Sequence, residues 1–250
     1  MDLRPESGPG RSGVAAVIGL AVVWEIVGRL DVSFFVPPLS QVVAVWWSLV
    51  RDGTLPGAIG SSLLSLVRGF VPAAILGVSL GILTGTSRLA RYTLDPILNT
   101  LMSAPLSALV PVFIAIFGIR DTVVAATVFM FSFFVIVVNT QTGVLGTEAS
   151  LVQMARVFGA RPLSIVCWIH LPRALPAVFL GLRLGMVQAV KGMVVGEILI
   201  SVIGLGERLI YYGNTFLIPH LYAVILSVLI LALLASQLVE WADRALIRWK

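Results

Sequence analysis

Three ionisable residues, Arg183, Lys191 and Glu197, stand inside one long apolar stretch. If this stretch is a helix, Arg183 and Glu197 lie within about 40° of one another around its axis, and Lys191 lies about 80° from Arg183. Charged groups at membrane depth are costly and usually face a protein interior or a water-filled cavity. The three residues therefore predict either a positively lined translocation path for an anionic substrate, or side chains that anchor internal hydrogen bonds or lie nearer the membrane interface.

A second candidate for chemistry is the C-x-x-H pair formed by Cys167 and His170. A zinc site takes about four ligands, and only His220 remains among the cysteines and histidines. We therefore expect no metal site. A single cysteine also excludes an internal disulfide framework.

Motifs for catalysis are also missing from the sequence. It holds neither a G-x-x-x-x-G-K-[ST] phosphate loop nor a G-x-S-x-G elbow, and its twelve carboxylates are scattered. We expect a chain that is not an enzyme and binds no cofactor itself. The chain therefore offers no P-loop site at which it could bind ATP itself.

The composition indicates an all-α integral membrane protein. The chain is 58% hydrophobic and 12% charged, whereas soluble domains average about 25% charged residues. Its length suits about six spans joined by short loops. The net charge of +5 favours contact of arginines with anionic lipid rather than nucleic acid as a partner.

Apolar runs and their breaks divide the chain into segments. We expect a tail (1–13), a first span with an interfacial helix (14–56), a transmembrane core (57–241) and a second tail (242–250). Within these segments the spans are predicted at 14–30, 61–85, 94–117, 123–138, 174–200 and 221–239. Ser40 is expected to cap the interfacial helix, which carries Trp46 and Trp47, and residues 201–219 are expected to form an outer loop.

Two of these spans carry further patterns. Small residues recur every four positions in the second span, which lets helices approach closely, within one subunit or between subunits; they are Gly69, Ala73, Gly77, Gly81 and Gly85. The third span contains Pro96, Pro105 and Pro111. These prolines predict kinks, either beside a translocation path or in an ordinary lipid-facing helix.

The loop at 143–173 contains a short amphipathic helix. Leu151, Met154, Ala155 and Phe158 fall at i, i+3, i+4 and i+7 and so share one face. Thr147 is expected to cap a helix of roughly a dozen residues, which is too short to span a membrane. Gly159 and Pro162 end it, and a second short helix then runs from Pro162 until Leu171 and Pro172 close it.

This amphipathic helix needs a cover for its apolar face. It either docks into a partner protein or lies on the lipid surface. Docking is favoured, because the helix lacks the Lys/Arg-rich polar face typical of surface helices.

The distribution of Arg and Lys predicts the orientation. With both termini inside, ten of them fall on the cytoplasmic side: Arg4, Arg11, Arg88, Arg91, Arg156, Arg161, Arg173, Arg244, Arg248 and Lys250. Four fall outside: Arg29, Arg51, Arg120 and Arg208. This excess satisfies the positive-inside rule and puts the 143–173 loop in the cytoplasm.

The same loop resembles that of permease subunits of ATP-binding cassette (ABC) importers, whose pattern is Glu-Ala-Ala, three residues, Gly, nine residues, Ile, one residue, Leu-Pro. Here Gln153, Met154 and Ala155 stand at the Glu-Ala-Ala positions, and Arg156 follows. Gly159, Ile169, Leu171 and Pro172 keep the spacing, although Gln153 replaces the Glu. The runs GLRLG (181–185), VVGEIL (194–199) and GLGERLI (204–210) are similar to the nitrate, sulfonate and taurine branch.

The resemblance implies a type-I importer permease fold with cytoplasmic coupling helices between spans four and five. It implies a bacterial inner-membrane location, ATPase subunits that carry ATP and magnesium, an extracytoplasmic solute-binding protein and a second copy of the chain. An ion-gradient-driven secondary transporter is the alternative, but the paired inverted halves common in that class are not apparent. An integral-membrane enzyme would need a clustered polar site.

Overall fold

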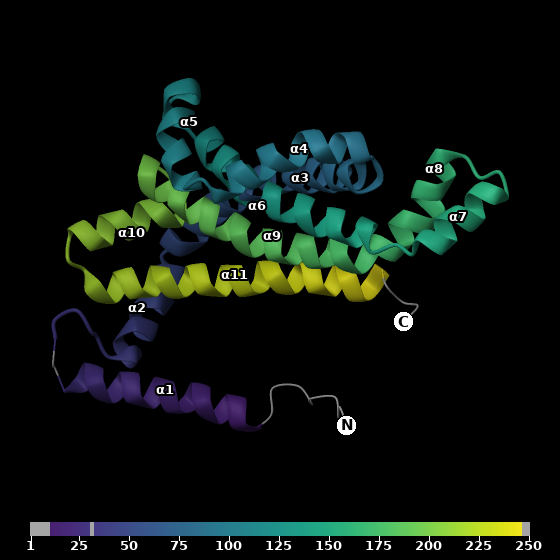
Figure 1. Cartoon of the computed structure of the whole chain (residues 1–250). Helices are drawn as coiled ribbons and strands as arrows, with labels where there is room; N and C mark the ends of the chain where they lie inside the picture. Colours follow the sequence, from purple (N-terminus) through teal and green to yellow (C-terminus); the bar gives the residue numbers. More distant parts are fainter. Residues whose placement is uncertain (1–10, 31–32, 247–250) are drawn as a thin grey trace.

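The computed structural model describes residues 11–30 and 33–246, in which every regular element is a helix (Figure 1). The elements are α1 (Arg11–Arg29), α2 (Leu39–Arg51), α3 (Thr54–Thr86), α4 (Arg88–Ser103), the 3-10 turn η1 (Leu106–Leu109), α5 (Val110–Phe117), α6 (Asp121–Leu145), α7 (Ala149–Val157), α8 (Pro162–Ile165), the π turn η2 (Val166–His170), α9 (Leu171–Ile200), α10 (Gly204–Asn214) and α11 (Ile218–Leu246).

Helix α6 lies between α3 and α9 and forms the centre of the bundle (Figure 1). The small residues predicted to mediate packing, Gly69, Ala73, Gly77, Gly81 and Gly85, are all buried on α3. The four glycines in this set face α6. A Cβ at Gly77 would lie 2.9 Å from Ile136, and one at Gly185 on α9 would lie 2.7 Å from the same side chain. Glycines on both flanking helices therefore let α6 approach closely within one chain.

The remaining helices cover this centre at its sides and ends. Helix α11 runs along α9, and α10 closes one end of the bundle, opposite the end from which α7 and α8 project (Figure 1). Helix α2 packs on α11, where Trp46 Nε1 donates to Ser227 Oγ at 2.9 Å. At the α2 end of the bundle, Arg68 of α3 forms an ion pair with Asp121 at the start of α6.

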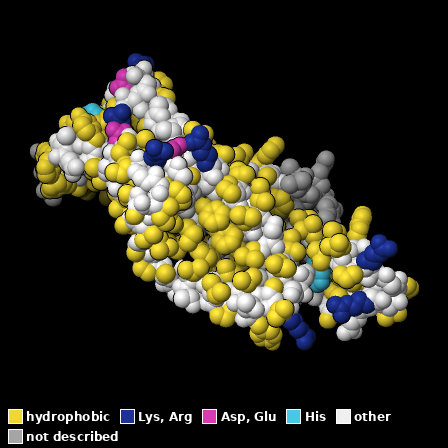
Figure 2. All heavy atoms as spheres, turned by 90° about the horizontal axis from the view of Figure 1, so that it is seen from above, with side chains coloured by type: hydrophobic (Ala, Val, Ile, Leu, Met, Phe, Trp, Pro, Cys, Tyr) yellow, Lys and Arg dark blue, Asp and Glu magenta, His cyan; other side chains and the backbone are white. Residues whose placement is uncertain are grey.

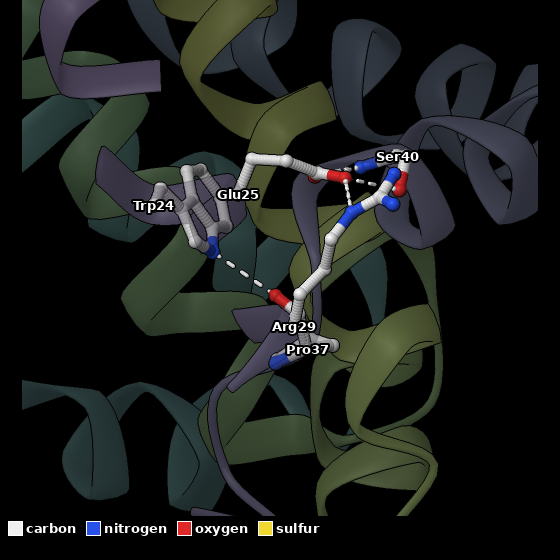
Figure 3. Close-up of polar contacts among 5 residues, drawn as sticks. All are labelled: Trp24, Glu25, Arg29, Pro37 and Ser40. Carbon is white, nitrogen blue, oxygen red and sulfur yellow. Dashed lines mark hydrogen bonds and ion pairs between the residues drawn. The ribbon is translucent and has the colours of Figure 1, made fainter. Parts of the chain in front are cut away.

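Helix α1 is joined to the start of α2 by polar contacts (Figure 3). The Glu25 carboxylate accepts hydrogen bonds from the Ser40 backbone N–H at 2.9 Å and from its hydroxyl at 2.8 Å, and Arg29 pairs with it at 2.6 Å. Trp24 Nε1 donates to the Pro37 carbonyl at 3.1 Å. The prediction that Ser40 caps α2 is wrong, because Ser40 lies inside the first turn of the helix. Its backbone N–H has no acceptor within α2 and donates instead to Glu25 of α1.

Four helical stretches in the described part of the chain are long and apolar enough to cross a membrane: 54–86, 121–145, 162–200 and 218–244. The pair 88–103 and 106–117 makes a fifth if a bent pair counts as one span. Helix α1 is not among them, so six spans remain a prediction. Figure 2 shows a broad apolar surface between two ends where Arg and Lys gather, as expected for a bundle in lipid.

Several predicted boundaries are wrong. The third span is not one helix from 94 to 117 but starts at Arg88 and bends by 93° beside Pro105. The fourth and last spans continue beyond 138 and 239, to Leu145 and Leu246. The segment 201–219 is not a loop, because most of it forms α10. The predicted tail 1–13 lies almost wholly outside the described residues, as do 247–250 of the second tail.

Candidate functional site

Helix α7 stands free at one end of the bundle. It spans only nine residues, none of them buried, and Gly159 ends it with a φ of +78°. Thr147 does not cap it: its hydroxyl instead meets His170 Nδ1 at 3.1 Å, which ties the start of α7 to the π turn. Glu148 occupies the capping position without a capping hydrogen bond from its side chain, so the helix starts one residue later than predicted and is shorter.

The second short helix is not closed by Leu171 and Pro172. Pro162 opens it as expected, but the chain stays helical through the π turn into α9, so that 162–200 is a single stretch of 39 residues. The π turn shifts the hydrogen-bonding register, and Pro172, which has no N–H, is accommodated at the first turn of α9.

The apolar face of α7 and the π turn together line one surface hollow of about 380 Å³. We call its lining residues the coupling surface: Leu151, Met154, Ala155, Phe158, Trp168, Ile169, Pro172 and Arg173. Phe158 and Trp168 are 83% and 81% exposed. Large apolar side chains exposed together are typical of a site that contacts another protein or the membrane.

Trp168 and Arg173 were not among the residues predicted for this surface. Trp168 lies four residues before Pro172 and would have joined this face if the helix had been read as continuous through Pro172. Arg173 reaches Glu148 at 3.5 Å, but both side chains are more than half exposed, so this pair contributes little.

The other predicted residues of the loop lie outside the coupling surface. Gln153 and Arg156 are exposed on α7, and Leu171 is half-buried at the start of α9. Arg156 instead lines a neighbouring hollow with Ser87 and His170.

The three ionisable residues of α9 do not form one site. The Arg183 guanidinium pairs with Glu240 of α11 at 3.0 Å, and Arg244 pairs with the same carboxylate at 2.5 Å. Lys191 is exposed on the outer face of α9. Glu197 is fully buried at the far end of α9, about 20 Å along the helix axis from Arg183. Arg183 and Glu197, predicted to lie on nearly the same face of the helix, therefore have different partners within this chain.

Glu197 holds the start of α10. Its carboxylate accepts a hydrogen bond from the Gly206 N–H at 2.8 Å, while Ser62 of α3 accepts one from the Leu205 N–H at 2.9 Å. The approach needs glycine at 204 and 206, because a Cβ at these positions would lie 2.2 and 2.4 Å from Glu197. A carboxylate at the positive end of a helix is favourable, so Glu197 positions α10 against α9.

Glu197→Ala is expected to lower the free energy of unfolding by about 1–3 kcal/mol, because the buried Gly206 N–H loses its acceptor. Glu197→Gln keeps an acceptor and is expected to lose about half as much. Thermal unfolding of the purified variants measures both. Glu207→Gln is the matched control in α10, because Glu207 makes only a 3.8 Å contact with Arg208. Equal stability of the Ala variant and this control would contradict the role of Glu197.

No group of three or more His, Cys, Asp or Glu residues gathers in a metal-binding arrangement within 11–30 and 33–246. Cys167 is exposed in the π turn. Three other features of the described residues are candidates for a functional role. They are the coupling surface, the bent pair α4 and η1–α5, and helix α10 with its contact to Glu197.

Comparisons with known proteins agree with this architecture. Residues 73–248 match the family described as binding-protein-dependent transport system inner membrane component. The chain is 29% identical to a putative aliphatic sulfonates transport permease protein, SsuC of Bacillus subtilis (strain 168), over 97% of this chain and 91% of that protein. It is 28% identical to CmpB, a bicarbonate transport system permease protein of Synechococcus elongatus, over 94% of this chain and 88% of that protein.

The fold is also that of a solved transporter chain. A chain of the MetNI methionine ABC transporter in an inward-facing conformation superposes with a TM-score of 0.67 at 21% identity, covering 80% of this chain and 96% of that chain. The type-I importer permease fold predicted from the sequence is thereby confirmed. The family match covers well over half of the chain, so this multi-pass membrane protein belongs to the binding-protein-dependent transport system inner membrane components, the permease subunits of ABC importers.

Proposed function

We propose that this permease imports a small oxoanion and that its coupling surface receives the ATPase subunit. Members of the family work with an ATPase and a binding protein. The observation that carries the docking site is the exposure of Phe158, at the end of the free-standing helix α7, and of Trp168 in the π turn at the same end of the bundle. ATP and magnesium are then held by the ATPase, and nucleotide-driven motion of that subunit moves α7.

The substrate class rests on the relatives. Sulfonates and bicarbonate, the solutes in the names of two similar permeases, are both small oxoanions. Within this chain Lys191 and Arg183 remain candidates for attracting such a solute, although Glu240 already pairs with Arg183.

The assembly we propose contains two copies of the chain in the inner membrane, with an ATPase on each coupling surface and a binding protein on the opposite side. The end that carries α7 faces the cytoplasm together with both termini, because the Arg and Lys residues favour this side by ten to four. The segments 14–56 and 57–241 are then the peripheral and the central parts of the membrane domain, and lipid surrounds both.

Cross-linking to the ATPase tests the proposed function. A photoreactive amino acid at Met154, which is 53% exposed on the coupling surface, is expected to capture the ATPase in membranes that contain both subunits. The matched control carries the same amino acid at Ile75, an exposed apolar residue in the middle of α3. Capture from both positions, or from neither, would contradict docking at the coupling surface.

The native Cys167 tests the orientation without any substitution. Because Cys167 is the single cysteine and is exposed beside the coupling surface, a membrane-impermeant maleimide is expected to label it in inside-out vesicles and not in intact right-side-out cells. Detergent-solubilised protein gives the full extent of labelling for comparison. Labelling in intact right-side-out cells would reverse the proposed orientation.

A further inference from the structure

A second hollow lies between the hook, as we call residues 149–170 with α7, α8 and the π turn, and the corner where α3 meets α4. It has a volume of about 480 Å³, which is within the range of sites that hold small ligands. We call it the corner hollow. Its lining includes Thr86 and Ser87 from the corner and Arg156, Ala160, Val166 and His170 from the hook. It shares no lining residue with the coupling surface, so it is a separate feature of the hook.

The charge of the corner hollow is positive. Arg156 and His170 line it, and no carboxylate among the described residues does. Arg156 forms no ion pair within 11–30 and 33–246, whereas Arg173 on the other side of the hook pairs with Glu148. At the end that carries α7, Figure 2 shows Arg or Lys side chains and a histidine, but no acidic side chain among the described residues in view. A hollow of this charge favours an anion.

Three side chains can donate hydrogen bonds to an anion in the corner hollow. The Arg156 guanidinium has a planar fork of N–H groups that matches the oxygens of a phosphate. Ser87 accepts a hydrogen bond from the Ala90 N–H at 3.3 Å, while its own O–H has no acceptor in the part of the chain that the structure describes. His170 Nδ1 meets Thr147 Oγ at 3.1 Å, and its Nε2 has no partner within the same residues. Charge-assisted donors of this kind are typical of a site for a phosphate group.

The corner hollow lies where the membrane ends. The apolar stretch 54–86 stops at Thr86, which is one of the lining residues. Arg91 follows in α4, and its guanidinium donates to the carbonyls of Thr84 and Gly85 at 3.0 and 2.6 Å, so a positive charge is fixed at this boundary. Lipid phosphates lie at the same level. In the orientation proposed above this is the inner leaflet, which is rich in anionic lipid.

The rest of the lining is apolar and continues onto the surface. Pro162, Leu163 and Val166 contribute to it, and Leu163 is 78% exposed. An acyl chain can lie along these side chains while its headgroup is held by the donors. Inorganic phosphate would leave the apolar part of the hollow in contact with water. The lining therefore favours a phospholipid.

We propose that the corner hollow binds a phosphate group through Arg156, with an anionic phospholipid as its favoured carrier, and that the bound lipid joins the hook to the α3–α4 corner. No residue of α7 is buried, and the contact between Thr147 and His170 holds its start. A headgroup that touches both walls would restrict the movement of α7 relative to α3. This consequence rests on the proposed function, because it affects transport only if α7 receives the ATPase.

Lipid binding to the purified full-length chain tests the site. Native mass spectrometry is expected to show bound phosphatidylglycerol in preference to phosphatidylcholine. Arg156→Gln is expected to weaken this binding at least ~10-fold, because a hydrogen bond between two charged groups is lost. Arg156 is exposed, so its substitution removes no internal packing. The matched control is Arg161→Gln, because Arg161 is exposed at the start of α8 but does not line the hollow.

Equilibrium dialysis with radiolabelled inorganic phosphate separates the two carriers. Binding of phosphatidylglycerol but not of inorganic phosphate would identify the lipid, and binding of inorganic phosphate that Arg156→Gln abolishes would identify the free anion. An equal loss in the Arg156→Gln and Arg161→Gln variants would show attraction by the charged surface instead of a site, and would overturn the proposal. So would binding that Arg156→Gln leaves unchanged, or the absence of binding of either ligand.

A substitution that fills the hollow tests its place independently of charge. Ala160→Trp leaves Arg156 intact but occupies the space beside it, so it is expected to lower lipid binding at least ~10-fold. Unchanged binding in a folded Ala160→Trp chain would place the lipid elsewhere. If this variant did not fold, the comparison of the two arginine variants would still decide.

Uptake by the assembled transporter in liposomes tests the consequence for transport. Replacing part of the phosphatidylcholine by phosphatidylglycerol is expected to raise uptake several-fold in the unsubstituted chain and not in the Arg156→Gln variant, which still captures the ATPase from position 154. Loss of this capture would assign Arg156 to the ATPase contact and overturn its role in the corner hollow. Failure of the proposed function looks different, because the unsubstituted chain would then capture no ATPase while it still bound the lipid.

Discussion

Replacing Phe158 by aspartate is expected to abolish uptake while the chain remains folded in the membrane. Phe158 is 83% exposed, and no residue of α7 is buried, so the substitution removes no internal packing. In the proposed assembly this side chain fills an apolar contact with the ATPase, whose loss costs about 2–3 kcal/mol. A buried, unpaired carboxylate costs more. Together these effects weaken ATPase binding by at least ~100-fold.

The measurements are capture of the ATPase by the tagged permease and uptake by cells that carry both. Leu163→Asp is the matched control, because Leu163 is 78% exposed at the same end of the bundle but lies outside the coupling surface. We expect this control to capture normally. Equal loss in both variants would point to a general effect of charge at this end, and no loss in either would remove Phe158 from the interface.

The second large effect is expected from Gly69→Ala on the packed face of α3. The added Cβ would lie 2.3 Å from the carbonyl oxygen of Ala125 and 2.6 Å from Cβ of Val128. Neither atom belongs to the flexible end of a side chain, so α3 and α6 must move apart. Overpacking of this kind costs about 1–3 kcal/mol and occasionally more. We expect less folded protein in detergent and a lower midpoint of thermal unfolding.

The control for this variant lies on the same helix. A Cβ at Gly60 would meet no atom within 4 Å. Alanine is favoured over glycine in a helix by about 1 kcal/mol, so Gly60→Ala is expected to keep or raise the stability. If both substitutions proved neutral, the close approach of α3 and α6 would not be a source of stability.

The features that the sequence predicted are those set by local spacing. The apolar face of α7 follows from Leu151, Met154 and Phe158 at helical intervals, and the packing of α3 follows from glycines four residues apart. In both cases the helix face seen in the structure is formed by the same residues whose spacing predicts it. No distant contact is needed to recognise such patterns.

Helix α10 was missed because its stability is not local. Glycines at 204 and 206 are typical of a turn in sequence, and the carboxylate that holds the start of the helix belongs to Glu197, in the preceding span. Likewise, the pairing of Arg183 with Glu240 depends on how α9 and α11 meet. A helical projection of α9 alone could only suggest a shared face with Glu197.

The prolines show the same limit. Pro72 and Pro176 lie inside helices that continue, whereas the chain breaks beside Pro105. The sequence predicts that a proline disturbs a helix, but the packing around it decides whether the helix ends. At Pro105 the packing of Leu101 and Leu106 against α6 holds the two arms apart.

The length of α9, from Leu171 to Ile200, has a mechanical consequence. Its 30 residues at helical rise extend for about 45 Å. A rod of that length converts a tilt of roughly 5° at its foot into a sideways sweep of about 4 Å at its tip. In the orientation proposed above, a push on the end of α9 beside α7 would thus reach the opposite side of the bilayer through the tilt of one rigid helix, without a relay of loosened segments.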